Sequence, residues 1–505
     1  MPLAPTAVGT QRVIGPWKGT ILTQFNAAAS AALGGPQWLA HQRAEAFERF
    51  EGMSFPAESE EIWRYSGVDG FDIGSFAPVD GPPRPGSSSS DLALAESLAR
   101  ALGPRSALVV TRDGFVRGVR LEPGLVAGSV EVNAARSEEA DNQKPHGLGE
   151  LAPPHDAFGE LHEAFLADAV LVTVAPKVVV TDPVVVVHLV GFAASGPSAP
   201  EAGAGMSCFP RSVVRIGRSA EARVIELFAR AGSGAPVSGG GGPRSAGVPG
   251  DSSSDLSDEG TALVVPVTEL EVGEDAHLHY ANLQVLDRSS TQIAVQASRI
   301  QSHGSLSSFA VGLGGHYARV RTDSDLAGQG AESFLLAAYF GSEEQVHDFR
   351  TLQDHHGPRT RSELLFTGAV ADRARSVYSG LIRIERGAHG ADAYQTNHNL
   401  VLSEGAHADS VPNLDIDEND VRCSHASTIG PINEDQRYYL ESRGIEPSVA
   451  ERLIVLGFFS DIAARAPFEG VGRFLRDAVG RRLSGRLPAD RPAVRTAPTR
   501  GGDGG

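Results

Sequence analysis

The sequence predicts a mainly β protein, a β-solenoid in which short strands wind into stacked coils, with a helical region at each end. Residues 169–430 are rich in β-branched side chains and are interrupted by glycine and proline, which is typical of many short strands. Within this stretch Ala374, Ala391 and Ala408 recur at intervals of 17 residues. We interpret this interval as one coil of strand, turn and strand, each coil burying the apolar face of its neighbour.

Residues 1–80 form a predicted N-terminal helical region. Within residues 36–50, PQWLAHQRAEAFERF, the side chains of Trp38, Leu39, Phe47 and Phe50 recur at roughly helical spacing. The proline that opens this stretch suits the first turn of a helix. A second short helix is expected at residues 59–64.

Residues 81–168 are predicted to be a linker followed by a mixed α/β region. The run GPPRPGSSSS at residues 81–90 has the composition of a flexible link. A strand is expected at residues 106–111 and a helix near residues 157–167.

The predicted solenoid core, residues 169–430, carries two segments that lack the apolar residues needed to pack. These segments, residues 194–205 and 231–260, consist mostly of Gly, Ser, Pro, Ala and acidic residues, so we expect disordered insertions.

Residues 431–485 form a predicted C-terminal helical domain. Asn433 is expected to cap its first helix, and Ser448 with Glu451 has the spacing of a capping box for the second. Residues 486–505 are rich in Pro, Arg and Gly and are expected to be a disordered tail.

Composition excludes several classes of function. The net charge of -18 argues against nucleic acid or an anionic membrane as a partner. No lysine follows a glycine, so the Gly-Lys pair of a phosphate-binding P-loop is absent. Two cysteines, no secretory layout in MPLAPTAVGTQRVIG and no long apolar run together predict a cytoplasmic protein without a disulfide framework.

One short stretch near the carboxyl end, residues 415–430, holds Cys423 and His425. Two residues apart on a strand, their side chains point to one face, so a thiolate and an imidazole could be offered together to a soft metal. Two ligands do not complete a coordination sphere, and a buried cysteine beside a surface histidine is the alternative. Because His425 lies 17 residues after Ala408, we place it at the uncovered end of the stack.

A second candidate is the histidine cluster His347, His355 and His356. With Asp348 or Asp354 it could bind a metal or act in acid–base chemistry. None of the standard zinc spacings is met, so histidines that satisfy backbone groups at solenoid turns are the alternative. The sequence leaves both open.

Two runs carry a resemblance to a known family. They are RTLQDHHGPRTRSELLFTGAV at residues 350–370 and residues 375–445, which include VRCSHAS and end in YYLESRGI. Together they resemble the SufB/SufD family of iron-sulfur cluster assembly proteins, most strongly over residues 346–460. VRCSHAS is similar to SufD, whereas the cysteine that SufB proteins carry one coil earlier corresponds to Ala406 here.

The resemblance implies a right-handed parallel β-helix core with helical domains at both ends. It further implies a non-catalytic SufD-like scaffold that pairs with a SufB-like paralogue through the ends of the two β-helices. A nascent iron-sulfur cluster, or iron, would be held by His425 and Cys423 together with ligands from the partner. This chain itself would bind no nucleotide. A SufC-like ATPase would dock on the C-terminal helices, where we expect Tyr438, Tyr439, Leu440, Arg443 and Leu453 to contact it.

Two other functions remain open at this point. The β-helix fold also hosts enzymes that act on polysaccharide, which would need catalytic groups in a groove along the solenoid. The chain could also be the SufB-type member of the same family, but the alanine at position 406 disfavours it.

Overall fold

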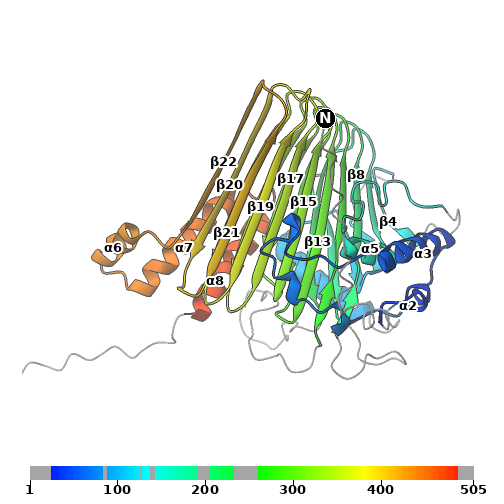
Figure 1. The fold of residues 1–505 in the computed structure, drawn as a ribbon, viewed down its shortest axis with the longest axis horizontal. Helices are drawn as coiled ribbons and strands as arrows, with labels where there is room; N and C mark the ends of the chain where they lie inside the picture. The colour runs from blue at the N-terminus through cyan, green and yellow to red at the C-terminus, as the bar shows by residue number, and fades with distance from the viewer. Residues whose placement is uncertain are drawn as a thin grey trace, which may run out of the picture.

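The computed structural model describes residues 24–82, 88–123, 128–136, 143–191, 205–231 and 260–486. Its centre is a β-solenoid, in which successive strands alternate between two long sheets that face each other (Figure 1). The first sheet has 12 strands and the second has 10. The predicted fold class, a β-solenoid with helices at both ends, is confirmed.

The main strands of each sheet pair in parallel, and each strand stacks on the equivalent strand of the coil before it. In the first sheet they are β5 (Val170–Val174), β8 (Arg211–Ile216), β11 (Val267–Val272), β13 (Ser290–Ile300), β15 (Tyr317–Leu326), β17 (Val346–His355), β19 (Arg375–Ile384) and β21 (His407–Ile416). In the second they are β6 (Val184–Val190), β9 (Glu221–Arg230), β12 (His277–Val285), β14 (Ser305–Gly312), β16 (Glu332–Gly341), β18 (Arg361–Val370), β20 (Ala391–Val401) and β22 (Val421–Gly430).

The 17-residue interval is not one coil, and that prediction is wrong. Tyr317 pairs with Val346 and Val346 pairs with Arg375, so a full coil in this region takes 29 residues. Ala391 begins β20 in the second sheet, whereas Ala408 lies on β21 in the first. The interval is therefore the step from one sheet to the other, because a ten-residue strand and its turn make half a coil.

The sheets also begin earlier in the chain than the predicted boundary at residue 169. β2 (Ala107–Arg112) pairs in parallel with β6, and β3 (Phe115–Leu121) pairs antiparallel with β2. β4 (Val130–Ala134) pairs antiparallel with β5. Three short strands, β1 (Phe76–Pro78), β7 (Gly205–Cys208) and β10 (Ala262–Val264), pair beside the first sheet. Part of the predicted mixed region therefore closes the first coils.

The space between the sheets changes character along the solenoid. In the early coils it is filled by aliphatic side chains such as Val172, Val186 and Leu270, which are almost fully buried. Nearer the C-terminal end it holds a polar network, in which Tyr339 Oη donates to Asn399 Oδ1 at 2.7 Å. Buried polar groups are stable only when they are paired, so this network fixes the late coils in one register.

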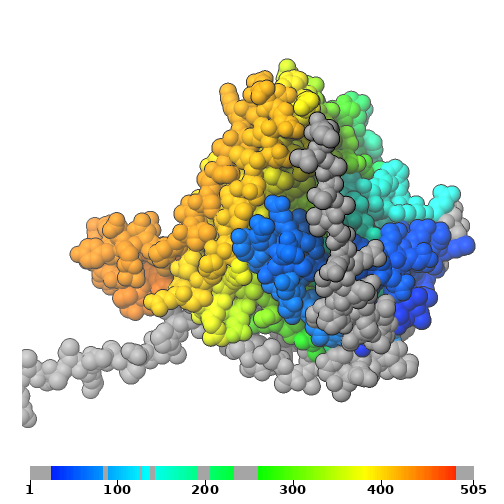
Figure 2. All heavy atoms as spheres, viewed as in Figure 1, coloured from blue at the N-terminus to red at the C-terminus, as the bar shows by residue number. Residues whose placement is uncertain are grey.

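Helices cover the outer face of each sheet. α4 (Ser88–Leu102), α7 (Pro447–Ala464) and α8 (Glu469–Arg486) pack against the second sheet in one apolar core. Part of the first sheet is covered by α2 (Ala27–Ala32), α3 (Gln37–Gly52) and α5 (Ala157–Ala164), with the short 3-10 helices η1 (Glu61–Trp63), η2 (Val68–Gly70) and η3 (Ile73–Ser75) (Figure 2). This cover reaches β15 and β17, where η1 is held by hydrogen bonds from Arg319 and Arg350. None of the described helices is long and apolar enough to cross a membrane.

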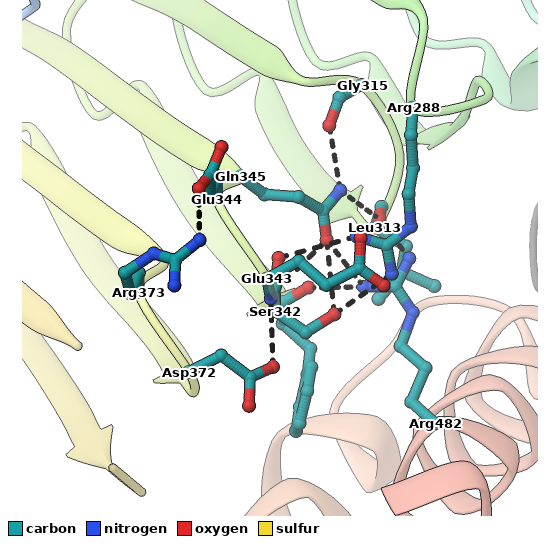
Figure 3. Close-up of polar contacts among 11 residues, drawn as sticks. Arg288, Leu313, Gly315, Ser342, Glu343, Glu344, Gln345, Asp372, Arg373 and Arg482 are labelled. Atoms are coloured by element: carbon teal, nitrogen blue, oxygen red, sulfur yellow. Dashed lines mark hydrogen bonds and ion pairs between the residues drawn. The ribbon is translucent and has the colours of Figure 1, made fainter. Parts of the chain in front are cut away.

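Arg482 fixes α8 against the second sheet (Figure 3). Its Nη1 donates to the carbonyl of Phe340 at 2.6 Å and to Gln345 Oε1 at 3.2 Å, and its Nη2 donates to the carbonyl of Leu313. These charge-assisted hydrogen bonds join the helix to the ends of β16 and β14. The helix and two coils of the solenoid are thereby joined.

Several predicted elements need correction. Ser88 begins α4, so the predicted flexible link at residues 81–90 ends in a helix that the sequence prediction missed. The expected helix at residues 59–64 is one turn of 3-10 helix. Glu446, not Ser448, caps α7, since its side chain accepts a hydrogen bond from the backbone of Val449. Most of the predicted insertions at 194–205 and 231–260, and nearly all of the tail at 486–505, lie outside the described residues.

Candidate functional site at the open end of the solenoid

The C-terminal end of the solenoid is open. β21 ends the strand order of the first sheet and β22 ends that of the second, so each is an edge strand in the described part of the chain (Figure 1). An edge strand offers a row of backbone N–H and C=O groups that can pair with another chain. This end is therefore suited to contact with a partner.

Cys423 and His425 lie on β22 and face the interior at this open end. Their register partners on β20, Ala393 and Gln395, are both buried between the sheets. Because side chains alternate along a strand, Cys423, His425 and Ser427 share that inward face, while Ser424 points outward. The structure thus brings the two predicted ligands to one face, at the mouth of the stack.

The environment of the two side chains differs. Cys423 is half-buried and packs against an apolar cluster, whereas His425 is exposed. Burial raises the pKa of the Cys423 thiol to about 11. Metals bind the thiolate, so this side chain needs an incoming cation to lose its proton at neutral pH. The buried members of this cluster are Ile382, Ile384, Ala388, Ala391 and Ala393.

Two side-chain hydrogen bonds lie next to Cys423 and His425, one on the preceding strands and one between the edge strands. Gln395, the register partner of His425, accepts a hydrogen bond from Tyr378 Oη at 3.0 Å. Ser427 Oγ donates to Ser410 Oγ at 2.8 Å, which joins β22 to β21 across the mouth. The second contact joins the two edge strands, and the first joins β19 to β20 beneath them.

Apolar side chains at the mouth are left uncovered. Ile416 on β21 and Ile429 on β22 follow the inward-facing pattern of their strands, yet they are 40% and 44% exposed. In the preceding coil the equivalent positions, Ile384 and Asn399, are buried. A further chain stacked on this end would bury both isoleucines.

Ala406 immediately precedes β21, so it lies about half a coil before Cys423 and not the full coil that was expected. It is buried against Val370, Ala374 and Ala408. The position that resembles the SufB cysteine therefore offers no thiol, and its small side chain serves packing alone.

The predicted docking residues lie on the C-terminal helices. α6 (Glu434–Ser442) projects away from the solenoid, with Tyr438 74% and Tyr439 56% exposed (Figures 1 and 2). Leu453 on α7 is 47% exposed and Leu440 is half-buried, while the guanidinium of Arg443 lies 4.9 Å from the Tyr439 ring centroid. Tyr438, Tyr439 and Leu453 are therefore large side chains that the C-terminal helices leave exposed. Asn433 caps α6 as predicted.

The three clustered histidines do not form one site. His347 and His355 point between the sheets, whereas His356 lies outside. His355 hydrogen bonds to the hydroxyls of Thr360 at 2.7 Å and Ser362 at 2.9 Å. Burial lowers the pKa of His347 to about 3 and that of His355 to about 4, so both are neutral at neutral pH. These two histidines are part of the core.

Known proteins match the region that contains this site. Residues 250–458 match the family model described as SUF system FeS cluster assembly, SufBD core domain. The chain is 28% identical over 455 residues to an iron-sulfur cluster assembly SufBD family protein of Mycobacterium tuberculosis, covering 88% of this chain and 94% of that one. It is 32% identical over 218 residues to SufD of Bacillus subtilis, and 30% identical over 216 residues to SufD of Escherichia coli. These two matches cover 43% of this chain and 50% and 51% of the relatives.

Proposed function

The chain belongs to the SufB/SufD family of iron-sulfur cluster assembly proteins, and we propose that within it the chain is a SufD-like scaffold subunit. In this proposal its open solenoid end pairs with a SufB-like paralogue, and its C-terminal helices dock a SufC-like ATPase. The nascent cluster is cargo at the shared end, and this chain carries out no catalysis of its own.

One observation carries the proposal. Cys423 and His425 face the interior at the end of the solenoid where β21 and β22 are the last strands of their sheets. Thiolate and imidazole suit iron, and a four-coordinate site would need two more ligands. A partner stacked on β21 and β22 would supply those ligands and bury the exposed isoleucines at the same time.

Two further features support the proposal that the chain acts with partner subunits. The sequence has no Gly-Lys pair for a P-loop, so ATP-driven motion would have to come from another subunit. The exposed face of α6 and α7 offers aromatic and aliphatic anchors of the kind that dominate protein interfaces. We place the complex in the cytoplasm, where reduced thiols persist.

Co-expression with the SufB and SufC homologues of the same genome tests the assembly. We expect the three chains to co-purify in one complex by size-exclusion chromatography. A chain that elutes alone, while SufB and SufC associate normally, would refute the scaffold role.

A pair of variants tests the ligands. His425→Ala is expected to reduce the iron and sulfide content of the purified complex and to leave its subunit composition unchanged. Ser424→Ala, whose side chain lies on the opposite face of the same strand, is the matched control and should retain full content. Wild-type iron in His425→Ala would remove that residue from the mechanism.

A further inference from the structure

A second group of metal-ligating side chains lies on the outer face of the first sheet. Asp354 is on β17, His356 follows the end of that strand, and Glu385 follows the end of β19. Because His355 pairs with Ile384, the next two residues, His356 and Glu385, are neighbours on adjacent coils. Donor atoms of Asp354, His356 and Glu385 lie within 4.8 Å of one another.

His356 is held in one orientation by a carboxylate from the preceding coil. Its Nδ1 lies 3.1 Å from Asp325 Oδ1, and Arg299 Nε donates to Asp325 Oδ2 at 2.8 Å. A carboxylate that accepts a hydrogen bond from Nδ1–H favours the tautomer in which Nε2 carries a free lone pair. Metal-bound histidines commonly have such a carboxylate behind them.

Only one of the two carboxylate oxygens of Asp354 lies near a partner. Its Oδ2 lies 3.9 Å from Arg383 Nη1, while Oδ1 is buried and has no hydrogen-bond partner among the described residues. Burial raises the pKa of this carboxyl group. A pocket of about 80 Å³ lies beside Asp354, which lines it together with Asp325 and Arg299.

The charges around the group leave it acidic. Three carboxylates, Asp325, Asp354 and Glu385, face two guanidiniums, Arg299 and Arg383. Arg383 is shared, because its Nε also donates to Asp415 Oδ2 at 3.3 Å on the next coil. Its position can therefore adjust toward Asp415 when a cation binds.

We propose that Asp354, His356 and Glu385 form a binding site for a first-row divalent transition metal ion. One imidazole and two carboxylates suit Mn²⁺, Fe²⁺, Co²⁺ or Zn²⁺, whereas Mg²⁺ and Ca²⁺ prefer oxygen ligands alone. The three ligands come from two neighbouring coils, so the bound ion joins β17 to β19. The site contains no thiolate, which separates it from Cys423 and His425 at the open end.

Titration of the full-length, untagged protein with Co²⁺ tests this site. The background variant Cys423→Ser with His425→Ala removes the other candidate ligands, so the result does not depend on the proposed scaffold function. We expect one Co²⁺ per chain, with visible d–d absorption and without the near-ultraviolet band of a cobalt–thiolate bond. A rise in the melting temperature should accompany binding, because the ion stabilises only the folded chain.

Isosteric variants assign the ligands. Asp354→Asn and His356→Gln are each expected to weaken Co²⁺ binding at least tenfold while the circular dichroism spectrum stays unchanged. The control is His407→Gln, which removes an exposed histidine of the same sheet whose Nε2 lies 3.1 Å from Asp409 Oδ1. Equal loss in the control, or unchanged affinity in Asp354→Asn, would overturn the proposal.

Discussion

The guanidinium of Arg319 lies 3.8 Å from the ring centroid of Trp63, although 255 positions of the chain separate them. Arg319 Nη1 also donates to Asp348 Oδ2 at 2.5 Å, and its Nη2 donates to the carbonyl of Ile62 at 2.6 Å. Arg350 repeats the arrangement one coil later, with Nε donating to Asp348 Oδ1 at 2.6 Å and Nη2 donating to the carbonyl of Arg64. A buried ion triad thus holds the N-terminal segment on β15 and β17.

Removal of the central carboxylate of this triad should destabilise the protein strongly. Asp348→Ala leaves two buried guanidiniums without their partner, which costs about 3–5 kcal/mol of the free energy of unfolding. Urea denaturation followed by circular dichroism measures the change. Glu344→Ala removes an exposed partner of Arg373 and serves as the control, for which we expect no measurable change. Equal effects of the two variants would contradict this account.

Acid should destabilise the folded chain through His355. Its pKa is lowered from 6.5 to about 4 by burial, so between these values the unfolded state binds more protons than the folded state. Stability contributed by the neutral ring is complete above pH 6.5 and falls as pH drops, by about 1.4 kcal/mol per pH unit. The free energy of unfolding of His355→Gln, subtracted from that of the unmodified chain, isolates this slope. A difference that does not change with pH would show that His355 is not buried in neutral form.

Loss of Arg482 should loosen α8 without unfolding the solenoid. Arg482→Met removes hydrogen bonds to the carbonyls of Phe340 and Leu313 and retains much of the apolar stem. We expect a loss of about 1.5–3 kcal/mol and faster proteolysis within the C-terminal helices. Arg473→Met changes an exposed arginine of the same helix and should leave the cleavage rate unchanged.

Alkylation should distinguish the two cysteines. Cys208 is fully buried, whereas Cys423 is half-buried at the open end. With a thiol pKa of about 11, Cys423 should react slowly with iodoacetamide at pH 7, and the rate should rise about tenfold per pH unit up to that pKa. Mass spectrometry after timed quenching gives the rates. A rate that levels off near pH 9 would show an unperturbed thiol.

Changes to the exposed side chains of α6 and α7 should weaken binding of the ATPase subunit and leave binding of the SufB homologue unchanged. In the proposed complex, Tyr438→Ala with Leu453→Ala removes two anchors, so the SufC homologue should be lost from co-purification while the SufB homologue stays bound. Leu121→Ala truncates an exposed leucine on β3, at the other end of the solenoid, and should retain both partners. Retention of SufC by the double variant would place its docking surface elsewhere.

Local pattern was enough to predict the elements at the C-terminal end. The cap of α6 by Asn433 follows from a side chain that binds a backbone group three residues away. The shared face of Cys423 and His425 follows from the alternation of side chains along a strand. Even the placement of His425 on the last strand was right, although the coil length used to reach it was wrong.

The class of fold, the helical ends and the two candidate ligands could be predicted from the sequence, because each depends on residues that are close along the chain. The folded structure was needed to show which strands stack on one another and that His347 and His355 face inward while His356 faces out. It was also needed to show that Glu385 lies beside His356. Those contacts join residues about one coil apart, and turns of unequal length hide that distance in the sequence. The docking of Trp63 on Arg319 likewise depends on surfaces that exist only once the coils have formed.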